Sequence, residues 1–349
     1  MAIVHGGGFN PTFRPHWGGA TSTVDQHLEI YEGVVDTVFK YSQNFQSWSA
    51  QKSTADRSNN YRIDRLAGSE VKGRKAGETI VDQRVASDKF NVIVEVMLYI
   101  RHPIDYMDDW TAPDFMPELG QNAGTAFGRA YDQAHIIRLQ KAGTWVAPTH
   151  LKTGGAFYDG FFKTAALLAP PVGTSLTEEQ MEDNAAALVT AHGDAVNELI
   201  KRRVPVQDLI TIVTPQVYSE LLHSKKVISS EFSTGAGDFA GRRVVHINGI
   251  PVVEHTEFPT GAITGHPLST TGNGNAFDVT AAEATAEMII FSKNLSLVTV
   301  TAKGWTTRFY DDEPQMTNVL DCFSMLTIDT RRPDTVAPIR VTRTVPVAP

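Results

Sequence analysis

Apolar residues alternate with other residues along one stretch of this chain, from residue 90 to residue 100. Side chains two positions apart lie on the same face of an extended backbone, so a period of two indicates a strand with one buried face. The sequence therefore predicts a single strand over Phe90–Ile100. Its buried face would carry Phe90, Val92, Val94, Val96, Leu98 and Ile100.

Three other stretches have the spacing of three or four residues that is typical of an amphipathic helix. The first helix is predicted to begin near Thr23. The second would span about 112–142, which is roughly 45 Å at the usual helical rise, and would end at Gly143. The third would run from Thr177, which has Gln180 at the spacing of a capping box, to about Arg203. The three apolar stripes are Leu28, Tyr31, Val35 and Val38; Leu119, Ala123, Phe127, Ala130, Ala134 and Ile137; and Met181, Leu188, Val196 and Leu199.

Short apolar runs dominate the remainder of the chain and predict strands, with a short helix after Pro215. The runs lie at 209–213, 243–248, 250–254, 288–291, 295–301, 319–328 and 339–345. Two connections, Ala147–Thr174 and Gly261–Glu287, have no clear period, and the sequence assigns them no role. Helices and strands thus occur together, which predicts a mixed α+β protein.

Two segments lack the apolar residues that a core requires. About the first twenty residues are rich in glycine and proline, and such a segment loses too much entropy to fold alone. Asp56–Lys89 contains eight basic and six acidic residues and almost no large apolar ones. We predict a two-stranded excursion there, which needs a neighbouring surface because an isolated hairpin is marginally stable. The cations expected to contact that surface are Arg62, Arg65, Lys72, Arg74 and Lys75.

Composition narrows the class of protein. The chain has 349 residues, of which 42% are hydrophobic and 20% charged, so it is globular, and its net charge of −8 makes it a poor dedicated binder of nucleic acid. The single cysteine, Cys322, allows no disulfide within the chain, as is usual in a reducing cytosol. We expect no signal peptide and no membrane span, because no stretch approaches 18 consecutive apolar residues.

Several short motifs resemble catalytic signatures but stand in the wrong context. His5–Gly8 matches the oxyanion loop of esterases, yet no Gly-x-Ser-x-Gly elbow accompanies it. Tyr106–Asp109 spells the metal-binding signature of reverse transcriptases without the flanking apolar strands that this use needs. Gly235–Gly241 resembles a phosphate-binding loop but follows a polar segment instead of a strand. None of the three motifs therefore predicts a site.

Two further candidates are equally weak. The triplet of signatures typical of penicillin-recognising enzymes occurs in the right order, but its first two members, Ser49–Lys52 and Ser58–Asn60, are too close in sequence to flank a cleft; the third is Lys152–Gly154. Cys322 lies in an apolar run that is typical of a buried strand. The histidines and the cysteine offer no metal-ligand spacing. The sequence therefore predicts no catalytic residue, no metal site and no cofactor.

The order of the predicted parts resembles the Hong Kong 97 capsid fold of tailed phages. Several segments are also similar to the major capsid proteins of short-tailed phages. The closest are Lys201–Asp208 with the following strand and Thr214–Ser219, and Gly249–Glu254. The helix Leu28–Phe39 leading to Ser47–Ser49 and the passage Val94–Lys141 are similar as well. The resemblance extends over most of residues 25–340, and Ala147–Thr174 and Gly261–Glu287 depart from it.

The resemblance implies a division of the chain into the named parts of that fold. Residues 1–50 would be the N-terminal arm with its helix, and residues 51–90 the E-loop. Residues 91–203 and 315–349 would form the peripheral domain with a spine helix at about 112–142. Residues 204–314 would form the axial domain. Some members of this fold cross-link subunits through a lysine of the E-loop; Lys72 and Lys75 lie in that region, but we do not expect a cross-link.

The resemblance also implies a structural function without enzymatic activity. The expected protein is a major capsid subunit that assembles into pentamers and hexamers of an icosahedral head around double-stranded DNA, which it does not bind specifically. Its expected partners are further copies of itself, a scaffolding protein and a portal, and a decoration protein is left open. The expected location is the host cytoplasm before assembly and the virion capsid afterwards. Two alternatives remain at this point: a hydrolase with a serine or cysteine nucleophile, and a phage tail or adhesin protein.

Overall fold

The structure is a computed structural model, and it describes residues 45–54, 58–80, 82–107, 116–171, 173–224 and 245–345. Several predictions lie outside these residues, namely those for the glycine-rich arm, the helix near Thr23, His5–Gly8, Asp108 and Asp109, and Gly235–Gly241. The chain divides into two compact units. The first contains Val96–Tyr131 and Lys303–Leu326, and the second contains Asn44–Glu95, Asp132–Ala302 and Thr327–Pro349.

The first unit is built from a helix and an antiparallel sheet. Helix α3 (Met116–Ala142) passes from this unit into the second, as do β10 (Leu297–Asp312) and β11 (Thr317–Thr330). Strand β4 (Met97–Asp105) pairs with β11 in an antiparallel register that sets Met325 opposite Met97 and Thr317 opposite Asp105. One face of this sheet packs on α3. The packed residues are Leu98, Ile100, Leu119, Ala123, Phe127, Leu320 and Cys322.

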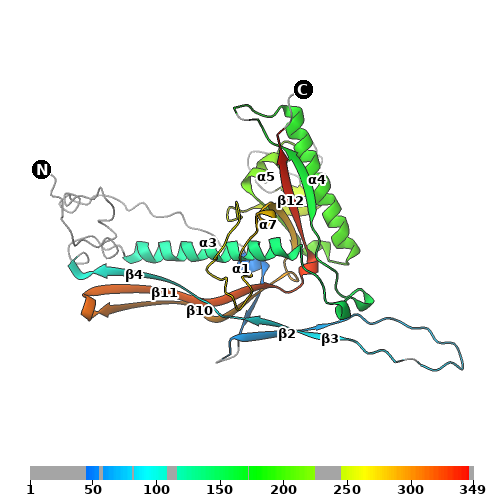
Figure 1. The fold of residues 1–349 in the computed structure, drawn as a ribbon, viewed down its shortest axis with the longest axis horizontal. Coiled ribbons are helices and arrows are strands. Elements are labelled where there is room, and N and C mark those ends of the chain that lie inside the picture. The colour runs from blue at the N-terminus through cyan, green and yellow to red at the C-terminus, as the bar shows by residue number, and fades with distance from the viewer. Residues whose placement is uncertain are drawn as a thin grey trace. The chain divides into compact units, whose positions relative to one another are not determined.

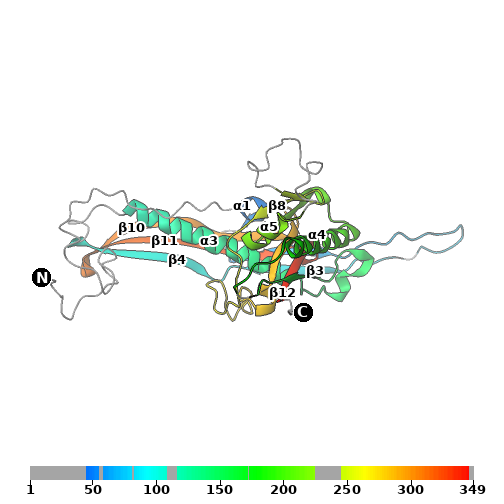
Figure 2. The same cartoon turned by 90° about the horizontal axis from the view of Figure 1, so that it is seen from above.

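The second unit contains a six-stranded mixed sheet, in the order β5-β12-β9-β6-β8-β7. Its strands are β5 (Lys163–Leu168), β6 (Leu209–Val213), β7 (Val245–Ile247), β8 (Ile250–Glu254), β9 (Ala286–Ser292) and β12 (Val336–Thr344). Helices α4 (Glu178–Lys201) and α5 (Pro215–Leu221) supply apolar side chains to the same core as this sheet. In Figures 1 and 2, α4 lies alongside β12.

The second unit also contains three short elements and a hairpin. They are α1 (Phe45–Trp48), β1 (Ala50–Ser53) and α7 (Ala281–Ala284), and the hairpin of β2 (Asn60–Leu66) and β3 (Ser87–Ile93). Strand β1 runs parallel to the start of β10 and extends the sheet of the first unit to the order β1-β10-β11-β4. Phe45 is fully buried, stacks on His135 and contacts Phe291, so α1 is fixed by the core.

The six-stranded sheet takes strands from both the predicted peripheral and the predicted axial segments, and the division into domains stays a prediction. Strands β5 and β12 belong to the segments assigned to the peripheral domain, whereas β6, β8 and β9 belong to the segment assigned to the axial domain. Hydrogen bonds nevertheless join β12 to β9 and β9 to β6. The boundaries at 203/204 and 314/315 therefore cut through one sheet, because strands pair by tertiary contact and not by order in the sequence.

The single strand predicted over Phe90–Ile100 is two strands. Residues 87–93 pair with β2, residues 97–105 pair with β11, and Val94–Val96 joins them. The predicted face is correct, since every second residue from Phe90 to Ile100 is buried or half-buried and the residues between are exposed. Alternation fixes which side chains face inward, but it carries no information on which strand supplies the hydrogen bonds.

The two longer helices in the described residues agree with their predictions. Helix α3 ends at Ala142, directly before Gly143, and its described stripe is buried or half-buried. Helix α4 begins after Thr177, whose hydroxyl accepts a hydrogen bond from the backbone of Gln180 while the Gln180 side chain accepts one from the backbone of Thr177. This reciprocal cap satisfies two backbone donors that the first turn would otherwise leave unpaired.

A histidine of α4 is buried among polar partners in the second unit. His192 is fully buried; its Nε2 lies 3.0 Å from the hydroxyl of Thr211, and its Nδ1 accepts a hydrogen bond from the Asn248 amide at 3.1 Å. Burial lowers the pKa of His192 from 6.5 to about 4. The unfolded chain therefore takes up this proton near its ordinary pKa, and the folded chain does so only in stronger acid.

We expect the free energy of unfolding to fall as the pH drops from 6.5 toward 4, with His192 contributing up to about 3 kcal/mol of the loss. Urea unfolding at pH 7 and pH 4.5 should show a smaller loss for His192→Gln than for the wild type. His150→Gln is the matched control, because His150 is exposed. An equal pH dependence of the wild type and His192→Gln would contradict this role.

Candidate assembly surface

The charged excursion predicted from the sequence is an antiparallel hairpin with a long loop. The register pairs Asn60 with Ile93 and Leu66 with Ser87. Alternation gives the hairpin two different faces. The face with Tyr61 and Ile63 is half-buried, and the face with Arg62, Asp64 and Leu66 is exposed. One face of the hairpin is therefore partly covered by the second unit.

Residues 69–85, called the outer loop below, have little support from the rest of the chain. After Ala67, whose amide bonds to the carbonyl of Ala86, no strand pairing continues along the described residues of the loop. All side chains described there are exposed except that of Gln83, which is half-buried. Figures 1 and 2 both show this loop extending beyond the paired part of the hairpin. The loop thus buries no core of its own, as its composition predicts.

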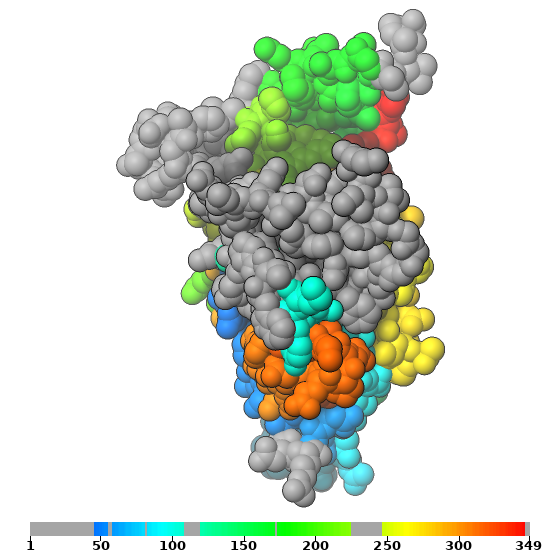
Figure 3. All heavy atoms as spheres, turned by 90° about the vertical axis from the view of Figure 1, so that its left-hand side faces the viewer, coloured from blue at the N-terminus to red at the C-terminus, as the bar shows by residue number. Residues whose placement is uncertain are grey.

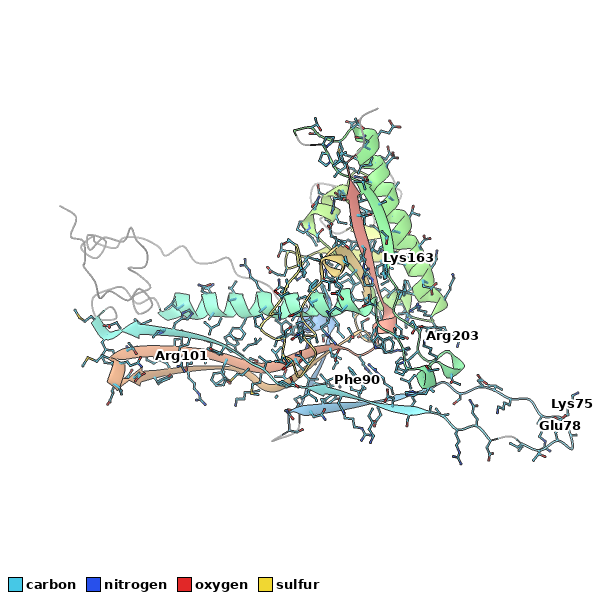
Figure 4. The ribbon with its side chains drawn as sticks, in the orientation of Figure 1. Lys75, Glu78, Phe90, Arg101, Lys163 and Arg203 are labelled. Carbon is cyan, nitrogen blue, oxygen red and sulfur yellow. The ribbon has the colours of Figure 1, made fainter. Side chains whose placement is uncertain are left out.

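The end of the outer loop is a defined turn. The amide of Glu78 donates to the carbonyl of Lys75 at 3.2 Å, and a carboxylate oxygen of Glu78 accepts a hydrogen bond from the amide of Lys75 at 3.0 Å. Gly77 has a φ of 90°, which glycine adopts without steric cost and other residues rarely adopt. Figure 4 places Lys75 and Glu78 together at this end. The turn therefore presents an adjacent cation and anion to solvent.

Four of the five predicted contact residues are exposed on this feature. Arg62 lies on the exposed face of β2 and forms an ion pair with Asp64 at 2.7 Å. Lys72, Arg74 and Lys75 lie on the outer loop with exposed side chains. Exposed charges of this kind contribute about 0–1 kcal/mol per pair to stability, so changing them costs the subunit little.

Arg65 requires a correction to this grouping. Its side chain is 8% exposed, its guanidinium lies 3.9 Å from the ring centre of Phe90, and it donates to the carbonyl of Arg331 at 2.9 Å. It therefore acts inside the subunit, and we remove it from the candidate contact residues. Composition alone cannot separate it from Arg62, because the two differ only in which face of β2 they occupy.

The hairpin and the outer loop also expose aliphatic side chains, which were not among the contact residues predicted from the sequence. Val71 is fully exposed and Ile80 is 69% exposed, both on the outer loop, and Leu66, Val85 and Ile93 are also exposed. A few apolar residues dispersed in a charged segment form no periodic pattern, so they could not be predicted from the sequence. Exposed aliphatic side chains on a loop that buries no core are candidates for contact with another protein.

The first unit has a second exposed surface on the sheet face opposite α3. Met97 and Tyr99 of β4 are exposed there, and Arg101 forms a two-pronged ion pair with Asp321 at 2.6 and 2.9 Å. The hydrogen bond from Arg101 holds the pKa of Asp321 below its ordinary value. Met316, at the end of the β10–β11 hairpin, is 67% exposed. This end of the hairpin, coloured orange, faces the viewer in Figure 3.

The described residues that resembled catalytic signatures have structural roles. Cys322 is buried in β11, as predicted, with its sulfur 3.9 Å from the Thr307 hydroxyl. Ser49 is buried and hydrogen-bonds to Thr299, and Lys152 forms an ion pair with Asp159. In the part of the chain that the structure describes, no cluster of three or more potential ligands could hold a metal ion. No described helix has the length and apolar character of a membrane span.

Comparison with known proteins assigns the family. No family model and no curated protein matches the sequence. Among solved structures, a chain of the bacteriophage PhiM1 mature capsid is 37% identical, with a TM-score of 0.78, over 95% of this chain and 97% of that chain. The chain belongs to the family of phage major capsid proteins. Its fold is the Hong Kong 97-like fold expected from the order of its parts.

More distant capsid structures share the fold of this major capsid protein. The capsid chain of cyanophage P-SCSP1u is 17% identical with a TM-score of 0.73, over 92% of this chain and 94% of that one. A chain of Mycobacterium phage Che8 is 16% identical with a TM-score of 0.59, over 89% of this chain and 96% of that one. At these identities the likeness shows a shared fold and nothing finer.

Proposed function

We propose that this major capsid protein self-assembles into the pentamers and hexamers of an icosahedral phage head that encloses double-stranded DNA. The observation that carries this is the 37% identity to a capsid chain over nearly the full length of both chains. Expression of the chain together with the scaffolding protein of its phage tests it: electron microscopy should show closed shells of uniform size. Sheets, fibres or monomers only would contradict the proposal.

The outer loop is the surface that we assign to contact between copies. It has exposed aliphatic side chains at Val71 and Ile80 and exposed cations at Lys72, Arg74 and Lys75, and all its described side chains except that of Gln83 are exposed. A loop with this composition gains stability only by covering a partner surface. Apolar contacts would supply affinity, and the mixed charges would set register and orientation. We also assign Arg62, on the exposed face of β2, to the contact between copies.

We propose a division into domains that differs from the predicted boundaries and keeps each sheet whole. We assign the spine helix and the β4–β11 sheet to the peripheral domain, and the six-stranded sheet with α4 and α5 to the axial domain. This assignment moves α4, β5 and β12 out of the predicted peripheral segment. It is supported by the hydrogen bonds that join β12 to β9 and β9 to β6.

The remaining partners follow from the proposed head. A scaffolding protein and a portal would take part in assembly in the host cytoplasm, and the short-tailed phages remain the proposed source. The packaged DNA would lie inside without specific binding, because a net charge of −8 repels phosphate. A decoration protein, if one exists, would bind the assembled shell.

We further propose that the protein has no enzymatic activity. Cys322 is the one cysteine, and it is almost completely buried, with a threonine hydroxyl near its sulfur and no described base beside it. A nucleophilic cysteine needs an activating base and access to substrate. Cys322→Ser should therefore form particles in the wild-type yield. A hydrolytic turnover of the purified protein that this change abolishes would contradict the proposal.

A further inference from the structure

The backbone on one side of the hairpin loop crosses another segment at very short range. The amide of Gly68 donates to the carbonyl of Thr153 at 3.1 Å. A side-chain carbon at Gly68 would lie 2.8 Å from the carbonyl oxygen of Gly154, and one at Gly154 would lie 2.8 Å from the carbonyl carbon of Gly68. Gly154 also has a φ of 67°. Only glycine at both positions permits this approach, because real side-chain carbons do not approach backbone atoms so closely.

Arg65 of β2 lies among three aromatic rings next to this crossing, and this group is called the cage below. The guanidinium of Arg65 lies 3.9 Å from the centre of the Phe90 ring and 5.8 Å from those of Trp145 and Phe157. Ala67 is buried in one small cluster with Ala147, Leu151 and Phe157. Cation–ring contacts are strongest where water is excluded, as it is around a side chain that is 8% exposed. The cage therefore fixes β2 against residues 145–157.

Residues 145–157 are in turn tied to the six-stranded sheet. Arg332, which directly precedes the turn into β12, lies 4.5 Å from the ring centre of Phe157 and donates to the carbonyl of Ala156 at 2.5 Å. Its guanidinium also forms an ion pair with the buried Asp334 at 2.8 Å. The connection whose role the sequence left open thus links the hairpin to a core strand.

From these contacts we infer that Arg65, Ala67, Gly68 and residues 145–157 form a root that fixes, in the free subunit, the direction in which the outer loop leaves the body. The inference rests on the proposed role of the outer loop as the contact between copies. Beyond the root, the described loop has only isolated hydrogen bonds, such as that from the amide of Glu70 to the side chain of Gln83. A loose loop on a fixed root searches a small volume, which lowers the entropy lost when a neighbour binds.

Gly68→Ala tests the root, with Gly73→Ala as its matched control, because a side-chain carbon at Gly73 would meet nothing within 4 Å. Hydrogen exchange of the free subunit should show the amides of Ala67 and Gly68 protected in the wild type and in Gly73→Ala. Gly68→Ala should lose about a hundredfold of that protection while β6 keeps its own. Light scattering should then show Gly68→Ala assembling about tenfold more slowly than the control.

Arg65→Met provides a second variant in case Gly68→Ala does not fold, with Arg62→Met on the exposed face of the same strand as its control. A folded Gly68→Ala or Arg65→Met that keeps the Ala67 and Gly68 amides protected would overturn the root. A variant that loses the protection of these amides but assembles at the wild-type rate would also overturn it. Arg74→Glu/Lys75→Glu tests the contact between copies separately, because it leaves the root unchanged. Normal assembly of that variant would refute the outer loop as a contact. The hydrogen-exchange result for Gly68→Ala would still stand.

Discussion

Closed particles should disappear when Arg74 and Lys75 are both changed to glutamate, while the subunit melts within about 2 °C of the wild type. Both side chains are exposed near the end of the outer loop, and no core lies beneath them. Their charges therefore contribute little to the stability of the subunit. In a shell, the same contact recurs in every copy, so a repulsion that is small at one contact acts at all of them. Sucrose gradients and electron microscopy measure particles, and calorimetry measures melting.

The matched control for this variant exchanges the two residues and keeps their charges. Arg74→Lys/Lys75→Arg should form particles in near wild-type yield. Raising the salt concentration should restore part of the assembly of the glutamate variant, since exposed charges are screened over about 10 Å at 0.1 M salt. If the glutamate variant forms closed shells at every salt concentration, the outer loop is not an assembly contact through these charges.

The second large effect concerns the amides of the outer loop. In the free subunit, residues 69–85 should exchange nearly as fast as an unfolded peptide, because little but solvent contacts them. In the assembled shell, we expect protection to rise by at least about a hundredfold as the loop lies on a neighbour. Mass spectrometry of peptides from both states measures the difference. We expect the same change for residues 1–21, where the glycine-rich composition gives the motivation.

Strand β6 is the internal reference for this experiment. All five of its residues are buried, so its amides should be protected equally in the free subunit and in the shell. Equal protection of the outer loop in both states would contradict its ordering by a neighbour. A rise in protection that includes β6 would instead indicate that the free subunit is partly unfolded.

Local patterns in the sequence determined several elements of this protein. The stripe on α3 and the cap at Thr177 use interactions within one or two turns of a helix, so they can be predicted without knowing the fold. The charged segment after residue 56 was predictable as an excursion for a similar reason, since a run without large apolar residues cannot bury a core. The buried face from Phe90 to Ile100 follows from the geometry of an extended chain.

Only the tertiary structure decided how these elements combine. The alternation of residues 90–100 continues without a break through Val94–Val96. Before this link the chain pairs with β2, and after it the chain pairs with β11. The side-chain pattern does not show this change, because the hydrogen bonds between strands are made by the backbone. Likewise, Arg62 and Arg65 are both arginines of the same charged segment, yet Arg62 is exposed and Arg65 is buried against aromatic rings. The glycine pair at 68 and 154 lies far apart in the sequence and meets only in the folded chain. Such long-range contacts depend on the whole fold, whereas a short window of sequence specifies only local backbone conformation and the side chains that face inward.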